Sequence, residues 1–255
     1  MRITRSRTGI PGFDKLTQGG IPAGTTMLLC GTPGTAKSIF SMQYIYEGAK
    51  KFNERGLYVS FEQNKKALFR QASQFGWNFE ALEKKGLLHF FCIPVKNINH
   101  QTVEDIMRYV SKNGIKRLVI DSLSTLSIMA PMYSAINDLF LKELVTQETI
   151  FSPNLSEDFL LKRFIYFLIG SLQESTVTTI LISEIGKDSE FLSRDTVSEF
   201  LADGVIQMLF EPMGGQYSRS LMVRKMRHTK NDEDIHPVEI GKKGIVVHAG
   251  NGSGN

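Results

Sequence analysis

Short apolar runs alternate with amphipathic stretches along the first two thirds of the chain. The apolar runs predict buried strands at 27–30, 57–61, 87–93, 117–122 and 177–183. Apolar positions at helical spacing predict helices between them, over 39–51, 67–75, 79–85 and 101–111. Strands that alternate with helices in this way predict an α/β fold, with a mainly parallel sheet flanked by helices on both faces.

The pattern changes after Asp203. Two pairs of apolar segments, 205–210 with 218–227 and 238–240 with 245–247, each flank a glycine-containing turn and predict C-terminal antiparallel hairpins. The last residues, 249–255, are small and polar and predict a flexible tail. No internal repeat is evident, so residues 1–248 are expected to form a single domain.

Two further segments carry weaker or mixed signals. Residues 159–172 are almost continuously apolar and predict a buried helix, with Ser156 as its N-cap. Residues 132–154 are interpreted as an insertion with a short helix of its own. Near the N-terminus, Ile10, Phe13 and Leu16 are expected to pack under the sheet while the surrounding glycines form turns.

Composition and charge narrow the class of protein. The 255 residues are 42% hydrophobic, which is enough for a sizeable core. No apolar stretch approaches the roughly 20 residues of a membrane span, and no signal peptide is evident. Cys30 and Cys92 are expected to be buried free thiols, which fits the cytoplasm. The net charge of +4 permits a nucleic acid partner without requiring one.

A glycine-rich loop follows the first predicted strand and leads into a helix. Residues 31–38, Gly-Thr-Pro-Gly-Thr-Ala-Lys-Ser, follow the P-loop pattern G-x-x-x-x-G-K-[ST] except that Ala36 replaces the second glycine. Lys37 is expected to reach the β- and γ-phosphates of a nucleotide, and the Ser38 hydroxyl to bind Mg²⁺. The alternative is a glycine-rich turn without a ligand, which the Lys-Ser pair in register disfavours.

Two carboxylates are expected beside this loop, because ligands bind at the carboxyl ends of parallel strands. Asp121 ends one strand and is interpreted as the carboxylate that holds Mg²⁺ through water. Glu62 ends another and faces the γ-phosphate if its strand neighbours the P-loop strand. There it would orient or deprotonate an attacking water. For both residues the alternative is an exposed carboxylate at a strand end.

Lys225 and Arg227 lie two residues apart on a predicted strand and are therefore expected on one face, together with Leu221 and Val223. That face begins apolar and ends basic, as in a strand that runs from the core to an edge. Basic groups there would neutralise the phosphates of a neighbour's ATP. Spacing alone favours ordinary solvated charge on an edge strand.

Together these motifs resemble the RecA superfamily and, within it, the KaiC-like and RadA-like ATPases. The resemblance covers residues 8–247 and is carried by Thr8–Asp14, Gly19–Pro22, the P-loop, Phe61-Glu62, Phe75-Gly76-Trp77, Ile120-Asp121-Ser122 and Lys225-Met226-Arg227. The last motif is similar to the K-x-R finger of KaiC-like proteins, which reaches the nucleotide of the neighbouring subunit. The resemblance therefore implies a RecA-like P-loop core and a homo-oligomeric ring, expected to be a hexamer.

The resemblance also implies roles for individual residues. It places ATP or ADP against Gly34, Thr35, Ala36, Lys37, Ser38 and Ile39 of one subunit and against Lys225, Met226, Arg227 and Thr229 of its neighbour. It implies Ser38 and Asp121 as the Mg²⁺ site, and Glu62 as the catalytic glutamate, assisted by Lys37, Lys225 and Arg227. Gln63 stands where KaiC-like proteins often carry a second carboxylate, which together with Ala36 implies slow hydrolysis.

The expected function is an ATPase that acts as a regulatory or signalling switch for an unidentified protein partner. One alternative is a RadA-like DNA-binding recombinase. Residues 184–196, after the last predicted parallel strand, carry two basic and four acidic residues, which disfavours a nucleic acid partner at this loop. Another alternative is a nucleotide-gated binding module with little turnover, which Gln63 favours.

Overall fold

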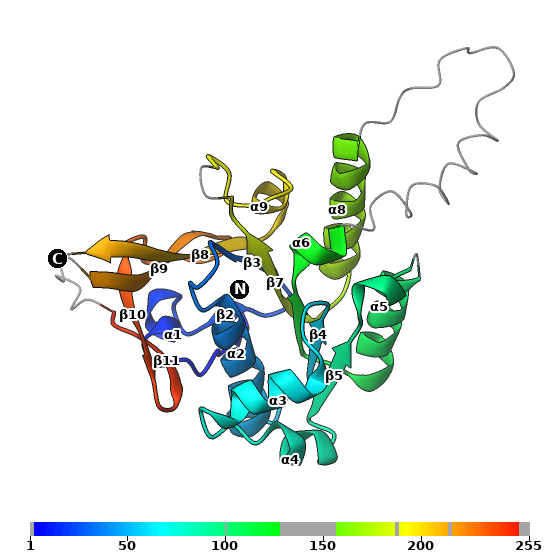
Figure 1. Ribbon diagram of the computed structural model, residues 1–255, viewed down its shortest axis with the longest axis horizontal. Helices are drawn as coiled ribbons and strands as arrows, with labels where there is room; N and C mark the ends of the chain where they lie inside the picture. The colour runs from blue at the N-terminus through cyan, green and yellow to red at the C-terminus, as the bar shows by residue number, and fades with distance from the viewer. Residues whose placement is uncertain (1–2, 100, 128–156, 187–188, 214–215, 250–255) are drawn as a thin grey trace, which may run out of the picture.

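A nine-stranded sheet forms the centre of the computed structural model, which describes residues 3–99, 101–127, 157–186, 189–213 and 216–249. The strand order is β11-β10-β9-β8-β3-β7-β6-β4-β5 (Figure 1). Neighbouring strands from β8 to β5 are parallel: β8 (Gly204–Met213), β3 (Thr26–Gly31), β7 (Thr178–Glu184), β6 (Arg117–Asp121), β4 (Gly56–Ser60) and β5 (Leu88–Cys92). The pairs that involve β9 (Gln216–Met226), β10 (His236–Gly241) and β11 (Gly244–Val247) are antiparallel.

Helices cover both faces of this sheet. Met27 and Leu29 of β3 belong to one buried cluster, which includes residues of α2 (Lys37–Phe52), α3 (Lys65–Ser73) and α4 (Phe79–Lys84). Leu28 and Cys30 belong to the opposite cluster, which includes residues of α5 (Thr102–Asn113), α6 (Leu123–Leu126) and α8 (Glu157–Gln173). Strands buried on both faces have the continuous apolar runs seen in the sequence. The predicted α/β fold and its two C-terminal hairpins are confirmed.

The N-terminal segment forms a small unit against the sheet. Its two short strands, β1 (Arg5–Ser6) and β2 (Ile21–Pro22), pair with each other in antiparallel orientation. The helix α1 (Phe13–Leu16) lies between them in the chain. Ile10, Phe13 and Leu16 are buried in the cluster on the α2 face, which agrees with the prediction that they pack under the sheet. Two other short elements are a 3₁₀ turn, η1 (Val95–Asn97), and α9 (Ser198–Leu201).

Lys225 lies at the end of β9 that has a neighbouring strand on one side only. β9 lies between β8 and β10, but β10 pairs only with residues 219–221, so the end that carries Lys225 pairs with β8 alone, as expected for a strand that runs to an edge. A β-bulge pairs Val205 with Lys225 but Ile206 with Val223, so Arg224 is the extra residue. A bulge shifts the alternation of side chains by one position. Met226, rather than Lys225, therefore joins Leu221 and Val223 in the buried core, so the prediction that Lys225 shares the face of Leu221 and Val223 is wrong.

The prediction that the whole helix at 159–172 is buried is wrong for one of its sides. Phe164, Leu168 and Leu172 pack into the core, while Phe159, Tyr166 and Phe167 are 51%, 58% and 42% exposed. Only one face of a helix can meet a sheet, so an apolar sequence does not by itself bury every residue. The proposed N-cap Ser156 and the predicted insertion at 132–154 lie outside the described residues.

Two expectations from composition concern cysteines and membranes. Both cysteines are free, but only Cys30 is buried, while Cys92 is partly exposed near one end of β5. In the described ranges, no helix combines the length and apolar content that a membrane span requires.

Candidate functional site

The P-loop, residues 31–38, connects β3 to α2 and is held by a hydrogen bond within the loop. Thr35 Oγ1 donates to the Thr32 carbonyl oxygen over 2.9 Å, and the φ angles of Gly34 and Ala36 are 84° and 77°. Such left-handed residues turn successive N–H groups toward one concave side. Within the part of the chain that the structure describes, no side chain caps the N-terminus of α2. Its first N–H groups are therefore available to an anion.

Lys37, the first residue of α2, is buried at the base of the loop. Its Nζ donates to the carbonyl oxygens of Gly31 and Thr32 over 2.7 and 2.9 Å. These bonds use two of the three donors of an ammonium group. Burial lowers the pKa of Lys37, and the nearby carboxylates of Glu184 and Asp121 oppose that change. Lys37 is thus a buried cation with a donor left for a phosphate oxygen.

Asp121 is 2% exposed at the end of β6. The Tyr58 hydroxyl donates to Asp121 Oδ2 over 2.6 Å. Burial raises the pKa of Asp121 from 3.8 to about 6, and hydrogen bonds from Tyr58 and Ser38 oppose the increase. A buried carboxylate next to a serine hydroxyl offers the hard oxygen donors that Mg²⁺ prefers, so these residues fit the predicted metal.

Glu62, just beyond β4, is held by hydroxyl groups at the start of α6. Its Oε1 accepts hydrogen bonds from Ser122 Oγ over 2.6 Å and from Thr125 Oγ1 over 3.1 Å. The condition under which Glu62 was expected to face the γ-phosphate, that its strand neighbours the P-loop strand, is not met, because β7 and β6 lie between β3 and β4. Glu62 still lines the same cavity as the P-loop, because all four strands end at one edge.

A cavity of about 290 Å³ brings most of the predicted residues together. We call it the P-loop cavity; the predicted residues that line it are Gly34, Ala36, Lys37, Ser38, Ile39, Glu62 and Asp121. Thr35 is buried in the loop itself. Gln63, which the motif comparison singled out, also lines the cavity.

Arg219, Gln71 and Ile240 also line the P-loop cavity, and sequence reasoning did not find them. Arg219 Nε donates to the Gly34 carbonyl oxygen over 2.9 Å, and its guanidinium lies 4.3 Å from the centre of the Phe210 ring. No motif marks Arg219, because only the pairing of β9 with β8 brings it to a loop 185 residues earlier in the chain.

The predicted finger residues, Lys225, Met226, Arg227 and Thr229, do not line the P-loop cavity. Lys225 Nζ donates to the carbonyl oxygens of Glu199, Phe200 and Ala202 over 3.3, 3.0 and 2.7 Å. Arg227 Nη1 donates to Asp203 Oδ1 over 3.1 Å. Burial, followed by the charge of Arg227, lowers the pKa of Lys225. We refer to residues 225–229 as the finger segment.

The raised pKa of Asp121 predicts how stability depends on pH. The native state binds this proton more tightly than the unfolded chain, so Asp121 contributes stability below pH 3.8 that is lost as the pH rises through about 6. Replacing Asp121 by Asn is therefore expected to raise the free energy of unfolding of the nucleotide-free protein at pH 7.5 by about 3 kcal/mol, and by much less near pH 4. Urea unfolding at both pH values measures the difference.

Asp105 provides the control for this prediction, because its carboxylate is exposed on α5 and pairs with Arg108. Asp105→Asn is expected to leave stability nearly unchanged at both pH values. If the free energy of unfolding of Asp121→Asn does not exceed that of the wild type by more at pH 7.5 than at pH 4, burial does not raise the pKa of this carboxylate.

Ala36 is the one residue of the P-loop that departs from its pattern, and it adopts the left-handed conformation that the missing glycine would take freely, with φ 77° and ψ 23°. Ala36→Gly is expected to raise the free energy of unfolding by about 1 kcal/mol, because an alanine strains this conformation. Ala67→Gly, inside α3, is expected to lower it by about 1 kcal/mol. Thermal denaturation of both variants tests the opposite signs; a loss of stability in Ala36→Gly would contradict the prediction.

The strand order and the site define a class of protein. A P-loop after a central parallel strand, with carboxylates at the ends of two other strands of the same edge, is the arrangement of a RecA-type P-loop nucleotide-binding protein. A family model described as the KaiC ATPase matches residues 6–147 and 127–252. The chain belongs to the KaiC family.

Curated relatives agree with this assignment. A UPF0273 protein of Aeropyrum pernix is 32% identical over 246 residues, which cover 96% of this chain and 94% of the relative. A UPF0273 protein of Thermotoga maritima is 31% identical, with 98% of both chains covered. The circadian clock oscillator protein KaiC of Prochlorococcus marinus is 30% identical over 98% of this chain but 46% of its own length, so this chain spans about half of that protein.

A solved structure supports the same fold. The crystal structure of the KaiC-like protein PH0186 from Pyrococcus horikoshii matches with a TM-score of 0.76 at 33% sequence identity. The match covers 97% of this chain and 100% of that one. The KaiC-like resemblance and the RecA-like core that the motifs implied are confirmed.

Proposed function

We propose that the chain binds ATP with Mg²⁺ in the P-loop cavity and hydrolyses it to ADP and phosphate. The observation that supports this most is that Lys37, Ser38, Asp121 and Glu62 line one cavity, although their motifs lie far apart in the sequence. A phosphate-binding loop, an oxygen-donor pair for Mg²⁺ and a carboxylate that could act on water are the parts that phosphoryl transfer requires.

Each of these residues has a distinct role in the proposed reaction. Lys37 and the N–H groups at the start of α2 bind the phosphates. Ser38 would bind Mg²⁺ with its hydroxyl and Asp121 would hold it through water, and the bound metal would neutralise charge that develops on the phosphates. The hydroxyl groups of Ser122 and Thr125 hold one oxygen of Glu62, which orients the carboxylate toward an attacking water.

The proposal includes a second copy of the chain. Lys225 and Arg227 lie outside the P-loop cavity of their own subunit, so their proposed role is to contact the nucleotide of a neighbour in a ring, expected to be a hexamer, together with Met226 and Thr229. In this arrangement residues 1–248 act as one domain. The ring serves as a cytoplasmic regulatory or signalling switch for a protein partner.

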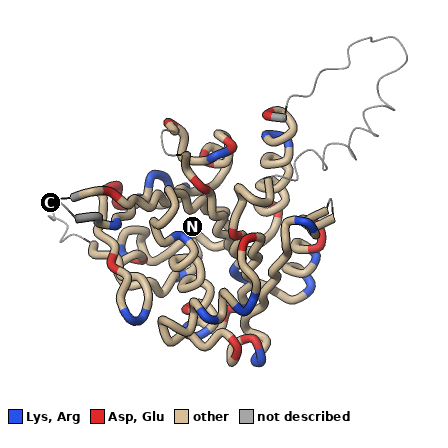
Figure 2. The backbone as a smooth tube through the Cα atoms, in the orientation of Figure 1, with Lys and Arg blue, Asp and Glu red and all other residues tan. Residues whose placement is uncertain are grey.

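The charge distribution supports a nucleotide-driven switch over a nucleic-acid-binding recombinase. Basic and acidic residues are interspersed over the described part of the chain (Figure 2). A strand-binding surface requires basic residues gathered along a groove or channel. The loop that follows β7, which would face such a channel in a recombinase, is net acidic.

Steady-state phosphate release from ATP with Mg²⁺, measured over a wide range of protein concentrations, tests the proposal. Specific activity is expected to rise with concentration, because the site is completed between subunits. Glu62→Gln is expected to lower it by about 10²- to 10⁴-fold while ATP binding persists. Glu80→Gln, an exposed carboxylate on α4 that pairs with Lys84, is the matched control and is expected to keep wild-type activity.

The other outcomes select the alternatives. If ATP binds and assembles the protein but no phosphate is released, the proposal of hydrolysis is wrong and the chain is a nucleotide-gated binding module. A salt-dependent shift of labelled single-stranded DNA would favour the recombinase. The absence of ATP binding in the wild type would reject all three.

A further inference from the structure

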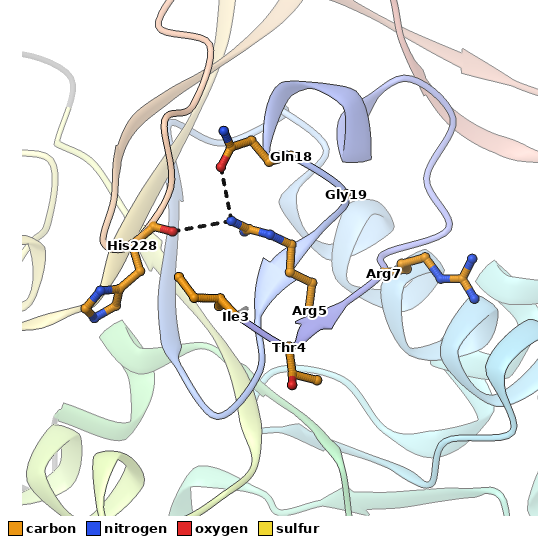
Figure 3. A pocket seen from close by; sticks show the side chains of 7 residues that line it. All are labelled: Ile3, Thr4, Arg5, Arg7, Gln18, Gly19 and His228. Carbon is orange, nitrogen blue, oxygen red and sulfur yellow. Dashed lines mark hydrogen bonds between the residues drawn. The ribbon is translucent and has the colours of Figure 1, made fainter. Parts of the chain in front are cut away.

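Arg5, in the short strand β1, joins the N-terminal segment to the finger segment. Its Nη1 donates to the Gly20 carbonyl oxygen over 3.1 Å and to Thr229 Oγ1 over 2.9 Å. Its Nη2 donates to Gln18 Oε1 and to the His228 carbonyl oxygen, each over 3.3 Å. Figure 3 shows the guanidinium group lying between Gln18 and His228. One side chain thus spans two segments that are more than 200 residues apart in the sequence.

The surroundings of Arg5 do not form an anion site, although they line an open surface pocket of about 650 Å³ that Arg7 and His228 also line. The guanidinium of Arg7 packs 4.5 Å from the centre of the Phe52 ring and points away from Arg5 (Figure 3). The four hydrogen bonds of Arg5 use the donors of both terminal nitrogens. All four acceptors are neutral, so the guanidinium organises the protein rather than offering its donors to a ligand.

His228 and Thr229, which Arg5 contacts, lie beyond the end of strand β9 and have no hydrogen bonds to the described residues of the sheet to hold them. β9 ends at Met226, and His228 adopts a left-handed φ of 60°, which is unfavourable for a residue with a Cβ. Among the described residues, Arg5 makes the only hydrogen bonds to His228 and Thr229 from outside the finger segment. Asp232 N, farther along, donates to the Leu16 carbonyl oxygen over 2.9 Å, which ties the same stretch to the N-terminal segment again.

We propose that Arg5 is a positioning residue that holds the end of the finger segment in the geometry in which it meets a neighbour's nucleotide. The inference rests on the proposed function, because the finger segment has that task only in an assembly. Arg5 itself touches no nucleotide in this proposal. Its effect passes through His228 and Thr229, and from there to Arg227, whose carbonyl oxygen accepts a hydrogen bond from Thr229 Oγ1 over 3.4 Å.

The test compares Arg5→Ala and Arg5→Lys with Arg7→Ala, which removes an arginine from the same pocket without touching the finger segment. Arg5→Ala is expected to lower phosphate release at saturating protein concentration by about 10²-fold, because displaced catalytic groups lose rate steeply. Affinity of the dilute protein for a fluorescent ATP analogue is expected to be unchanged. Arg5→Lys is expected to resemble Arg5→Ala, because a single ammonium cannot span four acceptors. Arg7→Ala is expected to resemble wild type.

Hydrogen exchange of the full chain provides a readout that does not depend on activity. The amides of Arg227 and Asp232 donate to the carbonyl oxygens of Asp203 and Leu16 and can report on this stretch. In Arg5→Ala, both are expected to exchange about tenfold faster, while amides inside α2, at residues 41–48, are unchanged. Unchanged exchange at Arg227 and Asp232, wild-type turnover of Arg5→Ala or Arg5→Lys, or an equal loss of nucleotide affinity in the dilute protein would each overturn the proposal. If the wild type neither assembles nor releases phosphate, the proposed function fails, and the exchange experiment still decides whether Arg5 holds the segment.

Discussion

Replacing Lys37 by methionine is expected to lower the affinity of the protein for ATP by about 100-fold, because charge-assisted hydrogen bonds to phosphate oxygens are lost. Methionine keeps the apolar stem of the side chain in its buried position and removes only the ammonium group. Burial already disfavours the charged form of Lys37, so the variant is expected to remain folded, with a melting temperature close to that of the wild type. Titration with a fluorescent ATP analogue, alongside thermal denaturation, measures both effects.

Lys51 offers a matched control for this variant. It belongs to the same helix, but its side chain is 51% exposed and pairs with Glu47. Lys51→Met is expected to bind ATP like the wild type. If Lys37→Met binds ATP within a few-fold of the wild type while remaining folded, the P-loop cavity is not the nucleotide site.

Arg227→Ala and Lys225→Met are expected to lower phosphate release by about 10³-fold, the range observed when an arginine finger is removed. Nucleotide affinity of the dilute protein is expected to be unchanged, because neither residue lines the P-loop cavity of its own subunit. Phosphate release and analogue binding, measured on the same preparations, separate the two effects. Arg224→Ala, at the exposed bulge position directly before Lys225, is the control.

Mixing two inactive variants tests the shared site directly. Lys37→Met keeps an intact finger segment and Arg227→Ala keeps an intact P-loop. If sites form between subunits, the mixture is expected to regain activity, because some interfaces then combine the intact halves. A mixture as inactive as its components, with Arg227→Ala losing nucleotide affinity when dilute, would place the finger residues in the site of their own subunit or in a structural role.

Both finger cations already have partners within their own chain. Arg227 pairs with Asp203, whose other carboxylate oxygen accepts a hydrogen bond from Thr26 N at the start of β3. Lys225 is held by three carbonyl oxygens around α9. Contact with a neighbour's phosphates would require these bonds to break, and removing either cation leaves its present acceptors unpaired, so thermal denaturation of both variants accompanies the assay of phosphate release.

Much of the candidate site could be predicted because its parts are local in sequence. The P-loop is one continuous stretch, and its conformation follows from glycines, a helix N-terminus and a lysine in fixed register. Asp121 could be placed because it follows an apolar run that predicts a parallel strand. The carboxyl ends of parallel strands lie at the same edge of the sheet as the P-loop. Glu62 was predicted at the right edge because it follows a parallel strand, although two strands separate β4 from β3.

Arg219 and Arg5 show why the remainder could not be predicted. Arg219 reaches the P-loop only because β9 pairs with β8 in one particular register, and Arg5 reaches Thr229 only because the N-terminal strands pack beside the finger segment. Neither arginine belongs to a sequence motif from which its hydrogen-bond partner could be predicted. Contacts between residues this far apart depend on packing that local propensity does not encode.

The sequence by itself determined the α/β class, the order of most elements and the P-loop chemistry, because apolar period, turn residues and loop motifs act over a few neighbouring residues. Only the tertiary structure decided the strand order, the bulge that separates Lys225 from the face of Val223, and which side of α8 is buried. The physical reason is that strand pairing and helix packing depend on contacts throughout the core. The surface of each element must fit those of all its neighbours at the same time.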